Sequence, residues 1–269
     1  MRREYEPIEV DHLSREDFVL EVFGPHYEAG QHVTFIGPTG SGKTTVAYEL
    51  LDEVAKPELP AIVLVMKPKD ETVVNWSKLA GFKTTEIWPP ATRRGVKNMA
   101  KSGGIGKKRR GFVFWPRQDL TDIDRDDARL SKEFKAALND SYHQGNNIIF
   151  ADEVVGLSKE LGLEKTLKAI WMRGRSLGCG LWAATQRPFE APLLMYGSAE
   201  HLIIFKDHDY RSVERFKEIG GVNPDTVEEA VQSLKKFEFL YIGRNMGQDG
   251  VSPAMAIVSS GTDIQTVRG

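Results

Sequence analysis

The segment FIGPTGSGKTTVAYELL, residues 35–51, places three glycines before a lysine and then continues into an apolar run. Residues 37–44 match the pattern G-x-x-x-x-G-K-[ST] in full, between a strand predicted over residues 31–37 and a helix predicted over residues 44–55. Glycines let backbone N–H groups turn inward around phosphate oxygens without Cβ clashes, and the helix N-terminus adds a favourable dipole. The segment therefore predicts a strand–loop–helix unit that binds the phosphates of a nucleoside triphosphate.

The residues of this loop have distinct expected roles. Lys43 is expected to reach the β- and γ-phosphates, and the Thr44 hydroxyl is expected to coordinate Mg²⁺. A glycine turn with an incidental lysine is the alternative, which the strand–loop–helix context disfavours. With ATP and Mg²⁺ as the expected ligands, the predicted binding residues are Gly37, Pro38, Thr39, Gly40, Ser41, Gly42, Lys43, Thr44 and Thr45.

The bulk composition fits one large α/β domain. The chain has 269 residues, of which 41% are hydrophobic and 28% are charged. No apolar run approaches the roughly 18 residues of a membrane span, and residues 1–13 lack the apolar centre of a signal peptide. Cys179 is the only cysteine, so an intramolecular disulfide and a thiolate metal cluster are excluded. A cytoplasmic protein without a membrane partner is expected.

Strands and helices alternate through the middle of the chain. Strands are predicted over residues 17–23, 31–37, 61–66, 111–115, 147–153, 180–186 and 201–206, and helices over residues 44–55, 126–144 and 164–176. Two late strands, over residues 237–243 and 254–260, are expected to form a hairpin. This order predicts three layers around a mainly parallel sheet. The expected organisation is a lead-in over residues 1–30, a core over residues 31–220, and a helix and hairpin over residues 221–269 that complete the same domain.

Two acids follow the predicted strand in IIFADE, residues 148–153. Ligands of open α/β sheets bind beyond the carboxyl ends of the strands. Asp152 is therefore expected to hold Mg²⁺ through water, and Glu153 to polarise the water that attacks the γ-phosphate. Acidic turns after strands are common, but together with the glycine loop the pair favours a catalytic site.

A glutamine ends another predicted strand, in GLWAATQ, residues 180–186. Gln186 can hydrogen-bond the γ-phosphate or the attacking water and report hydrolysis, although a polar strand end is the simpler alternative. Small-molecule kinases use a phosphate acceptor and need no water-activating glutamate. Glu153 and Gln186 therefore favour a hydrolase that drives motion over a small-molecule phosphotransferase.

The stretch MRGRSLGCGLWAATQRP, residues 172–188, resembles the HerA–FtsK superfamily of DNA-pumping ATPases. Members show an arginine-rich helix end, a glycine-containing turn, an apolar strand and then T/S-Q-R-P, which is the more specific signal. VLVMKPKDE, residues 63–71, is similar to the second strand of that group, which typically ends in Asp-Pro-Lys; here Lys67 replaces the aspartate, so the role of that acid does not transfer. SLKKFEFLYIGR, residues 233–244, resembles the terminal strand pair, and the likeness covers roughly residues 31–244.

The resemblance implies a RecA/ASCE-like P-loop fold and a homo-oligomeric ring, either a pentamer or a hexamer. In such rings the active site lies between subunits, and a neighbour supplies an arginine to the γ-phosphate. Arg175 is the first candidate and Arg173 the second. Alternatively, both arginines complement the C-terminal dipole of the preceding helix.

A basic insert, RRGVKNMAKSGGIGKKRR, spans residues 93–110 and contains eight lysines and arginines and no acid, in a chain whose formal net charge is −2. Such a segment suits sequence-independent contacts with phosphates. It lacks the aromatic side chains that stack on single strands, so double-stranded DNA is the expected partner. A solvated loop is the alternative. The predicted DNA-binding residues are Arg93, Arg94, Lys97, Lys101, Lys107, Lys108, Arg109 and Arg110.

Several motors share this core, and the sequence favours one of them. The membrane helices or large extra domains of cell-division and conjugation pumps are not seen, and residues 221–269 are too few for the nuclease of a large terminase. We therefore predict the ring motor that packages viral double-stranded DNA into a capsid, in the host cytoplasm and with a capsid portal protein as a candidate partner. The alternatives are a cytosolic DNA-pumping ATPase of a conjugative or mobile element, and a nucleotide-dependent assembly or switch ATPase that does not bind DNA.

Overall fold

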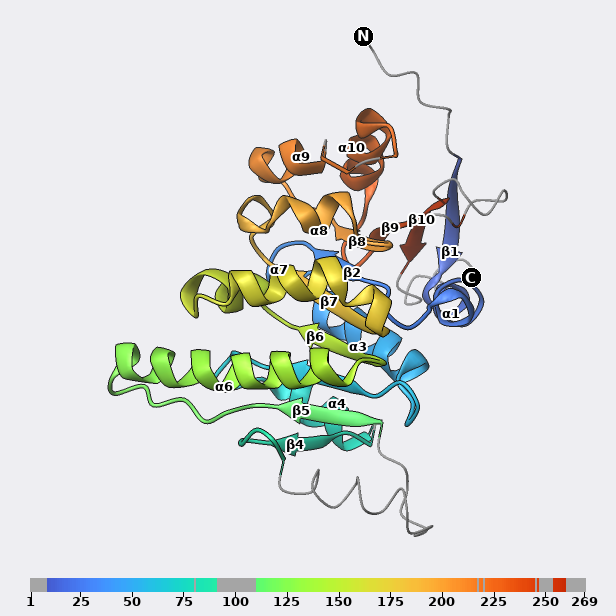
Figure 1. Ribbon diagram of the computed structural model, residues 1–269. Helices are drawn as coiled ribbons and strands as arrows, with labels where there is room; N and C mark the ends of the chain where they lie inside the picture. The colour runs from blue at the N-terminus through green and yellow to red at the C-terminus, as the bar shows by residue number, and fades with distance from the viewer. Residues whose placement is uncertain are drawn as a thin grey trace, which may run out of the picture.

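A mixed sheet of ten strands organises the residues that the computed structural model describes, namely residues 9–79, 81–90, 110–216, 218–219, 221–244, 246 and 254–259. In chain order these strands are β1 (Val10–Ser14), β2 (Val33–Ile36), β3 (Ala61–Leu64), β4 (Lys83–Thr85), β5 (Gly111–Phe114), β6 (Asn147–Ala151), β7 (Cys179–Thr185), β8 (His201–Phe205), β9 (Phe239–Gly243) and β10 (Ala254–Ser259). Their order across the sheet is β1-β10-β9-β8-β2-β7-β6-β3-β5-β4 (Figure 1).

The pairing of the strands confirms the predicted mainly parallel sheet. From β8 to β4 every neighbouring pair is parallel, whereas β9 is antiparallel to both β8 and β10. Strands β2, β3, β6, β7 and β8 are buried at every residue. Continuous apolar burial is typical of parallel strands covered on both faces.

Helices cover both faces of this sheet and make the expected three layers (Figure 1). Alternate strand residues enter two separate cores: Val63 packs with Val46 on one face, and Leu64 packs with Phe134 on the other. The first face is covered by α3 (Lys43–Val54) and α4 (Glu71–Leu79), and the second by α6 (Ile123–Gln144), α7 (Glu164–Arg173), α8 (Leu193–Gly197), α9 (Tyr210–Phe216) and α10 (Pro224–Ser233).

Residues 15–26 are helical, so the strand predicted over residues 17–23 is wrong. These residues form α1 (Arg15–Asp17), a π-helical turn over Phe18–Phe23 and α2 (Gly24–His26). The i→i+5 spacing of the π-turn brings Phe18 and Phe23 to the same side, where both are fully buried. The ring of Phe18 lies 4.8 Å from that of Tyr241. These two apolar residues therefore enter one core with a helical spacing, and the segment does not form a strand.

Three further elements have weak signals in the sequence, namely β1, β4 and α4. Strand β1 adds to the sheet by parallel pairing with β10, and β4 adds to its other edge by pairing with β5. Both contain exposed polar residues, as edge strands with one neighbour commonly do. No helix among the described residues is long and apolar enough to cross a membrane.

The fold gathers the predicted site at one edge of the sheet. Strands β2, β7, β6 and β3 are adjacent and parallel, so their carboxyl ends meet at that edge. The glycine loop, residues 37–44, follows β2, Gln186 follows β7, Asp152 follows β6, and Lys67 follows β3 closely. Ligands of parallel α/β sheets bind at this edge.

Candidate active site

The glycine loop turns sharply between β2 and α3. Gly40 and Gly42 have φ angles of 77° and 102°, which glycine adopts readily and other residues avoid. A Cβ on Gly37 would lie only 2.7 Å from Cβ of Phe205 on β8. The spacing of the glycines is thus explained by the backbone of the loop and by its close approach to the neighbouring strand.

The side chain of Lys43 is folded into this loop. Its Nζ donates hydrogen bonds to the carbonyl oxygens of Gly37 and Pro38, at 2.7 and 2.8 Å. Burial lowers the pKa of the Lys43 ammonium to about 8. The hydrogen bonds of this buried cation go to carbonyl oxygens of the loop, and phosphate oxygens would be stronger acceptors.

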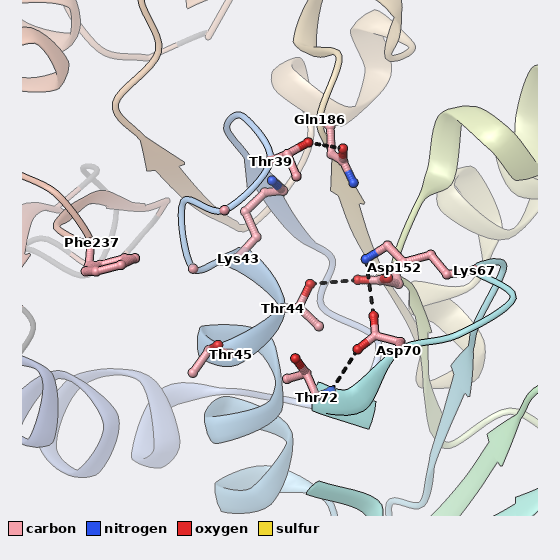
Figure 2. Close-up of a pocket in the computed structure, with 12 residues that line it drawn as sticks. Thr39, Lys43, Thr44, Thr45, Lys67, Asp70, Thr72, Asp152, Gln186 and Phe237 are labelled. Atoms are coloured by element: carbon pink, nitrogen blue, oxygen red, sulfur yellow. Dashed lines mark hydrogen bonds and ion pairs between the residues drawn. The ribbon is translucent and has the colours of Figure 1, made fainter. Parts of the chain in front are cut away.

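The structure brings together the two residues predicted to hold Mg²⁺. Thr44 Oγ1 donates to Asp152 Oδ1 at 2.9 Å, and the side chain of Asp152 is only 1% exposed. The other oxygen of Asp152 lies 3.0 Å from Nζ of Lys67, which also pairs with Asp70 at 3.3 Å. Figure 2 shows these groups meeting beside the glycine loop. A hydroxyl and a buried carboxylate thus converge with a lysine in the same small region.

The donor set fits a hydrated Mg²⁺ and phosphate. Asp152 Oδ2 has the ion pair with Lys67 but no hydrogen bond of acceptable geometry, and the buried Oγ of Ser41 has no hydrogen-bond partner. Unpartnered buried polar atoms are costly, and a phosphate or metal-bound water would supply the missing partners. Within the described residues no cluster of three or more His, Cys, Asp or Glu could hold a metal. Mg²⁺ needs no such cluster, because it retains waters and binds substrate phosphates.

Glu153 occupies a different position from Asp152. Its Oε1 accepts a hydrogen bond from the Val155 N–H at 3.3 Å, and it is not among the residues that line the pocket beside the loop. Burial raises the pKa of the Glu153 carboxyl. A carboxylate with a raised pKa is a stronger base at neutral pH, so the surroundings of Glu153 suit a catalytic base. The assignment of Glu153 to that role stays a prediction.

Gln186 contacts the glycine loop directly. Its side-chain Oε1 accepts a hydrogen bond from the hydroxyl of Thr39, and both residues line the pocket (Figure 2). The end of β7 is therefore joined to the loop through side chains. The role of Gln186 as a sensor of hydrolysis remains a prediction.

A pocket of about 270 Å³ combines these groups. Four of the residues were given no role in the pocket from the sequence: Lys67, Asp70, Thr72 and Phe237. Lys67 stood out only as a departure from the resemblance, and Phe237 comes from a distant turn with no local signal. The lining residues are Thr39, Gly40, Gly42, Lys43, Thr44, Thr45, Lys67, Asp70, Thr72, Asp152, Gln186 and Phe237.

The two candidate arginines lie away from this pocket. Arg173 ends α7, and Arg175 follows it just before β7. The seven residues of β7 separate Arg175 from Gln186 by roughly 20 Å, at about 3.3 Å per residue. The Arg175 guanidinium pairs with Glu200 at 3.0 Å and remains 62% exposed. Within one chain, neither arginine lies among the lining residues.

Only one residue of the basic insert lies in the described part of the chain. Arg110 donates from Nε to the carbonyl oxygen of Ala55 at 2.8 Å, and its guanidinium pairs with Asp52 near the end of α3. Arg110 therefore has intramolecular partners. The other predicted DNA-binding residues, Arg93, Arg94, Lys97, Lys101, Lys107, Lys108 and Arg109, lie outside the described residues.

Comparisons with known proteins bear on the fold. No family model matches the sequence, and no curated protein matches it. The DNA-packaging ATPase B204 of Sulfolobus turreted icosahedral virus is similar in structure, with a TM-score of 0.54 and 16% identity over 87% of this chain and 99% of that chain. The fold is that of a P-loop ATPase. VirB4 of Thermoanaerobacter pseudethanolicus shares it, with a TM-score of 0.58 and 11% identity over 86% of this chain and 90% of the other.

A third structure shows the same fold with a nucleotide analogue. It is the genome-packaging NTPase B204 of Sulfolobus turreted icosahedral virus 2 in complex with ATP-gammaS, with a TM-score of 0.51 and 16% identity over 84% of this chain and 95% of that chain. The predicted RecA-like fold is confirmed, and the resemblance to the HerA–FtsK group holds at the level of the fold.

Proposed function

We propose that this protein is an ATP-hydrolysing DNA translocase, and that it is the ring motor that packages viral double-stranded DNA into a capsid. The observation that carries the proposal is the contact of Thr44 with Asp152 beside the buried Lys43. It supports a magnesium–nucleotide site in the fold that the B204 DNA-packaging ATPases also have.

Hydrolysis in this site uses groups that the chain already positions. Lys43 stabilises the phosphate charge, and Mg²⁺ held by Thr44 and Asp152 would neutralise more of it when bound. Glu153 accepts a proton from water, whose oxygen attacks the γ-phosphorus while ADP leaves. Gln186 hydrogen-bonds the γ-phosphate or that water, and its contact with Thr39 transmits the change to the loop.

A ring completes the active site in this proposal. Arg175 is the first candidate for the arginine that a neighbouring subunit supplies, and Arg173 is the second. Their distance from the pocket of their own chain is consistent with action in a second subunit. The exposure of the Arg175 side chain supports the same role, since it can exchange Glu200 for a phosphate.

The basic insert supplies the grip on duplex DNA in the proposed motor. Its cations suit the phosphate backbone, which is contacted regardless of sequence. Arg110 already has partners within the chain, so the grip rests on the remaining seven residues, and above all on Lys107, Lys108 and Arg109.

The fold does not by itself select packaging, because VirB4 shares it with a TM-score of 0.58 and B204 with 0.54. The second candidate is therefore the alternative that the sequence left open, a DNA-pumping ATPase of a conjugative or mobile element. The genes beside this one discriminate between the two. Capsid, portal or scaffold genes support packaging and a portal partner, whereas conjugation genes support the alternative.

The first prediction tests whether duplex DNA stimulates hydrolysis. The native protein should release phosphate from ATP faster when duplex DNA is added, and Lys43→Ala should release none, because the main cation of the phosphate site is gone. A triple change of Lys107, Lys108 and Arg109 to alanine should keep basal hydrolysis and lose most of the stimulation. The slope of log DNA affinity against log salt concentration should also become less steep by about 2.7, since each of the three lost phosphate contacts contributes about 0.9.

A matched control removes three exposed cations elsewhere. Changing Lys132, Lys135 and Lys165 to alanine on α6 and α7 alters the net charge equally and should leave stimulation and salt slope nearly unchanged. Hydrolysis without any response to DNA would contradict the translocase and support the switch ATPase. If DNA affinity depends equally on salt in both triple variants, the DNA contacts are made by other residues.

A further inference from the structure

The backbone of Phe237 is strained. Its φ angle is 67°, a region that a bulky residue rarely adopts. Phe237 is the third residue of a turn closed by a hydrogen bond from the Glu238 N–H to the Lys235 carbonyl oxygen at 3.2 Å. Glycine or asparagine is favoured where this position has a positive φ. The turn therefore carries a phenylalanine where a smaller residue would be less strained.

Burial does not explain why phenylalanine occupies this position. Phe237 is 41% exposed, while its neighbours Phe205 and Phe239 are almost fully buried in the core. The Lys236 ammonium lies 4.9 Å from the centre of the Phe237 ring, so the ring interacts with a cation of its own turn and is not enclosed by the core. Strain at a residue that gains little from packing points to a role in binding.

Contacts from two other elements hold this turn in place. Arg15 Nη2 donates to the Phe237 carbonyl oxygen at 3.2 Å, and Arg15 Nη1 pairs with Glu49 of α3 at 3.1 Å. A Cβ on Gly42 would lie 3.6 Å from Phe237 Cδ1, so the ring packs beside the glycine loop. The aromatic ring is thus fixed against the start of the same helix that the loop opens.

Phe237 lies at the end of the pocket opposite the acids. Figure 2 shows Asp152 and Lys67 on one side of the loop, and Phe237 and Thr45 on the other. Thr44 and Asp152 mark the side of the metal and the terminal phosphate. A nucleoside triphosphate laid along the loop therefore extends its nucleoside toward Phe237.

We propose that Phe237 is the stacking platform for the nucleobase, and that the pocket selects purine nucleoside triphosphates. The inference rests on the proposed nucleotide site and adds the recognition of the base to it. A flat ring beside the loop offers a π-face to a planar base, and stacking of bases on aromatic side chains is a strong and general interaction. Purines stack over a larger area than pyrimidines, which gives the preference.

Calorimetric titration with defined probes tests this assignment. The probes are ATP, CTP and inorganic tripolyphosphate, which has the phosphates without a base. Phe237→Asn should weaken ATP binding about tenfold, the loss expected of one base–aromatic stack, and should leave tripolyphosphate binding unchanged. Phe237→Trp should keep the ATP affinity. The native protein should bind ATP more tightly than CTP, and Phe237→Asn should lose that difference.

Thermal unfolding separates a binding role from a structural one. Asparagine tolerates a positive φ, so Phe237→Asn should unfold at the same temperature as the native protein or higher, although it binds ATP less well. Tyr210→Ala, which removes a 75% exposed aromatic of α9, is the control and should change neither property.

Two results would overturn the base platform. One is an ATP affinity of Phe237→Asn equal to the native value; the other is an equal loss of ATP and tripolyphosphate, which would indicate damage to the phosphate loop. If the native protein binds neither ATP nor tripolyphosphate, the proposed nucleotide site itself is refuted, and the base platform with it.

Discussion

Lys67 places a cation where the HerA–FtsK resemblance leads one to expect an acid. Its backbone is held by the indole of Trp115, whose Nε1 donates to the Lys67 carbonyl oxygen at 2.7 Å. Its ammonium bridges Asp152 and Asp70, and Asp70 in turn accepts from the Thr72 N–H at 3.0 Å at the start of α4. Lys67 therefore pairs with the same buried carboxylate, that of Asp152, which is expected to hold Mg²⁺.

A second prediction follows for the metal dependence of nucleotide binding. Replacing Lys67 with methionine should lower the Mg²⁺ concentration that gives half-maximal ATP binding by at least about fivefold, because two unit charges of like sign about 4 Å apart repel by about 1 kcal/mol even in water, and Mg²⁺ carries twice the unit charge. Lys67→Arg keeps the charge and should resemble the native protein. The measurement is ATP affinity as a function of Mg²⁺ concentration. A higher Mg²⁺ requirement in Lys67→Met would instead show that the lysine itself binds the phosphates.

At the scale of elements, a buried histidine joins three segments at the end of the sheet opposite the nucleotide pocket. His201 begins β8, with Nε2 at 2.9 Å from Gln31 Oε1 and Nδ1 at 2.8 Å from the hydroxyl of Tyr241 on β9. Gln31 Oε1 also accepts from the Glu28 N–H, so it is an acceptor and Nε2 carries the proton. The hydroxyl of Tyr241 has one proton and two neighbouring acceptors, Nδ1 and the Sδ of Met246 at 2.9 Å, and burial favours the neutral histidine.

The pH dependence of stability gives a third prediction. Burial lowers the pKa of His201 to about 3, whereas the unfolded value is about 6.5. Between these values the unfolded chain binds a proton that the folded chain does not. The contribution of His201 to stability is therefore full above about pH 6.5 and falls by up to about 1.4 kcal/mol per pH unit as the pH drops toward 3.

Urea unfolding at pH 7, 6 and 5 measures this slope. His201→Gln should be less stable at pH 7 but should lose less stability on acidification than the native protein. His32, whose pKa burial also lowers, contributes equally to both proteins and cancels in the comparison. Parallel slopes for the two proteins would show that His201 does not titrate as its surroundings indicate.

On the scale of the whole molecule, the sheet separates the nucleotide pocket from the candidate arginines. The pocket lies at the carboxyl ends of β2, β6 and β7, and Arg175 lies before the first residue of β7. One chain cannot bring the two together without dismantling its sheet. A second subunit can, which is why the proposed catalytic unit is an interface.

Mixing two inactive proteins provides the fourth prediction. Glu153→Gln and Arg175→Ala should each lose most hydrolysis, because one lacks the base and the other the arginine that stabilises the transferred phosphate. In mixed rings, some interfaces pair an intact Glu153 with an intact Arg175, so phosphate release should partly recover. The assay is ATPase activity across a series of mixing ratios.

Native-like hydrolysis by Arg175→Ala alone would reject that arginine and transfer the role to Arg173, which forms no ion pair within the described part of the chain. Loss of activity without recovery at any ratio would count against action between subunits. ATP binding should survive in both variants, and its loss would reveal damage to the pocket.

Short patterns in the sequence determined the phosphate loop and the buried strands. The glycines at 37, 40 and 42 predict the loop because glycine allows its backbone angles. The apolar run at 61–66 predicts a strand covered on both faces, and residues 147–153 predict a strand that ends in two acids. Asp152, the first acid after β6, could be placed at the pocket because parallel strands end at one edge. Each of these inferences depends on residues close together in the chain.

Tertiary structure alone decided which distant side chains complete the pocket. Lys67 meets Asp152 because β3 pairs with β6, and Phe237 meets Gly42 because the turn before β9 packs beside the loop. The helical turns at 15–26 likewise follow from the core that Phe18 enters. Local spacing does not specify these contacts, because they are set by the order of the strands across the sheet and by which faces they share.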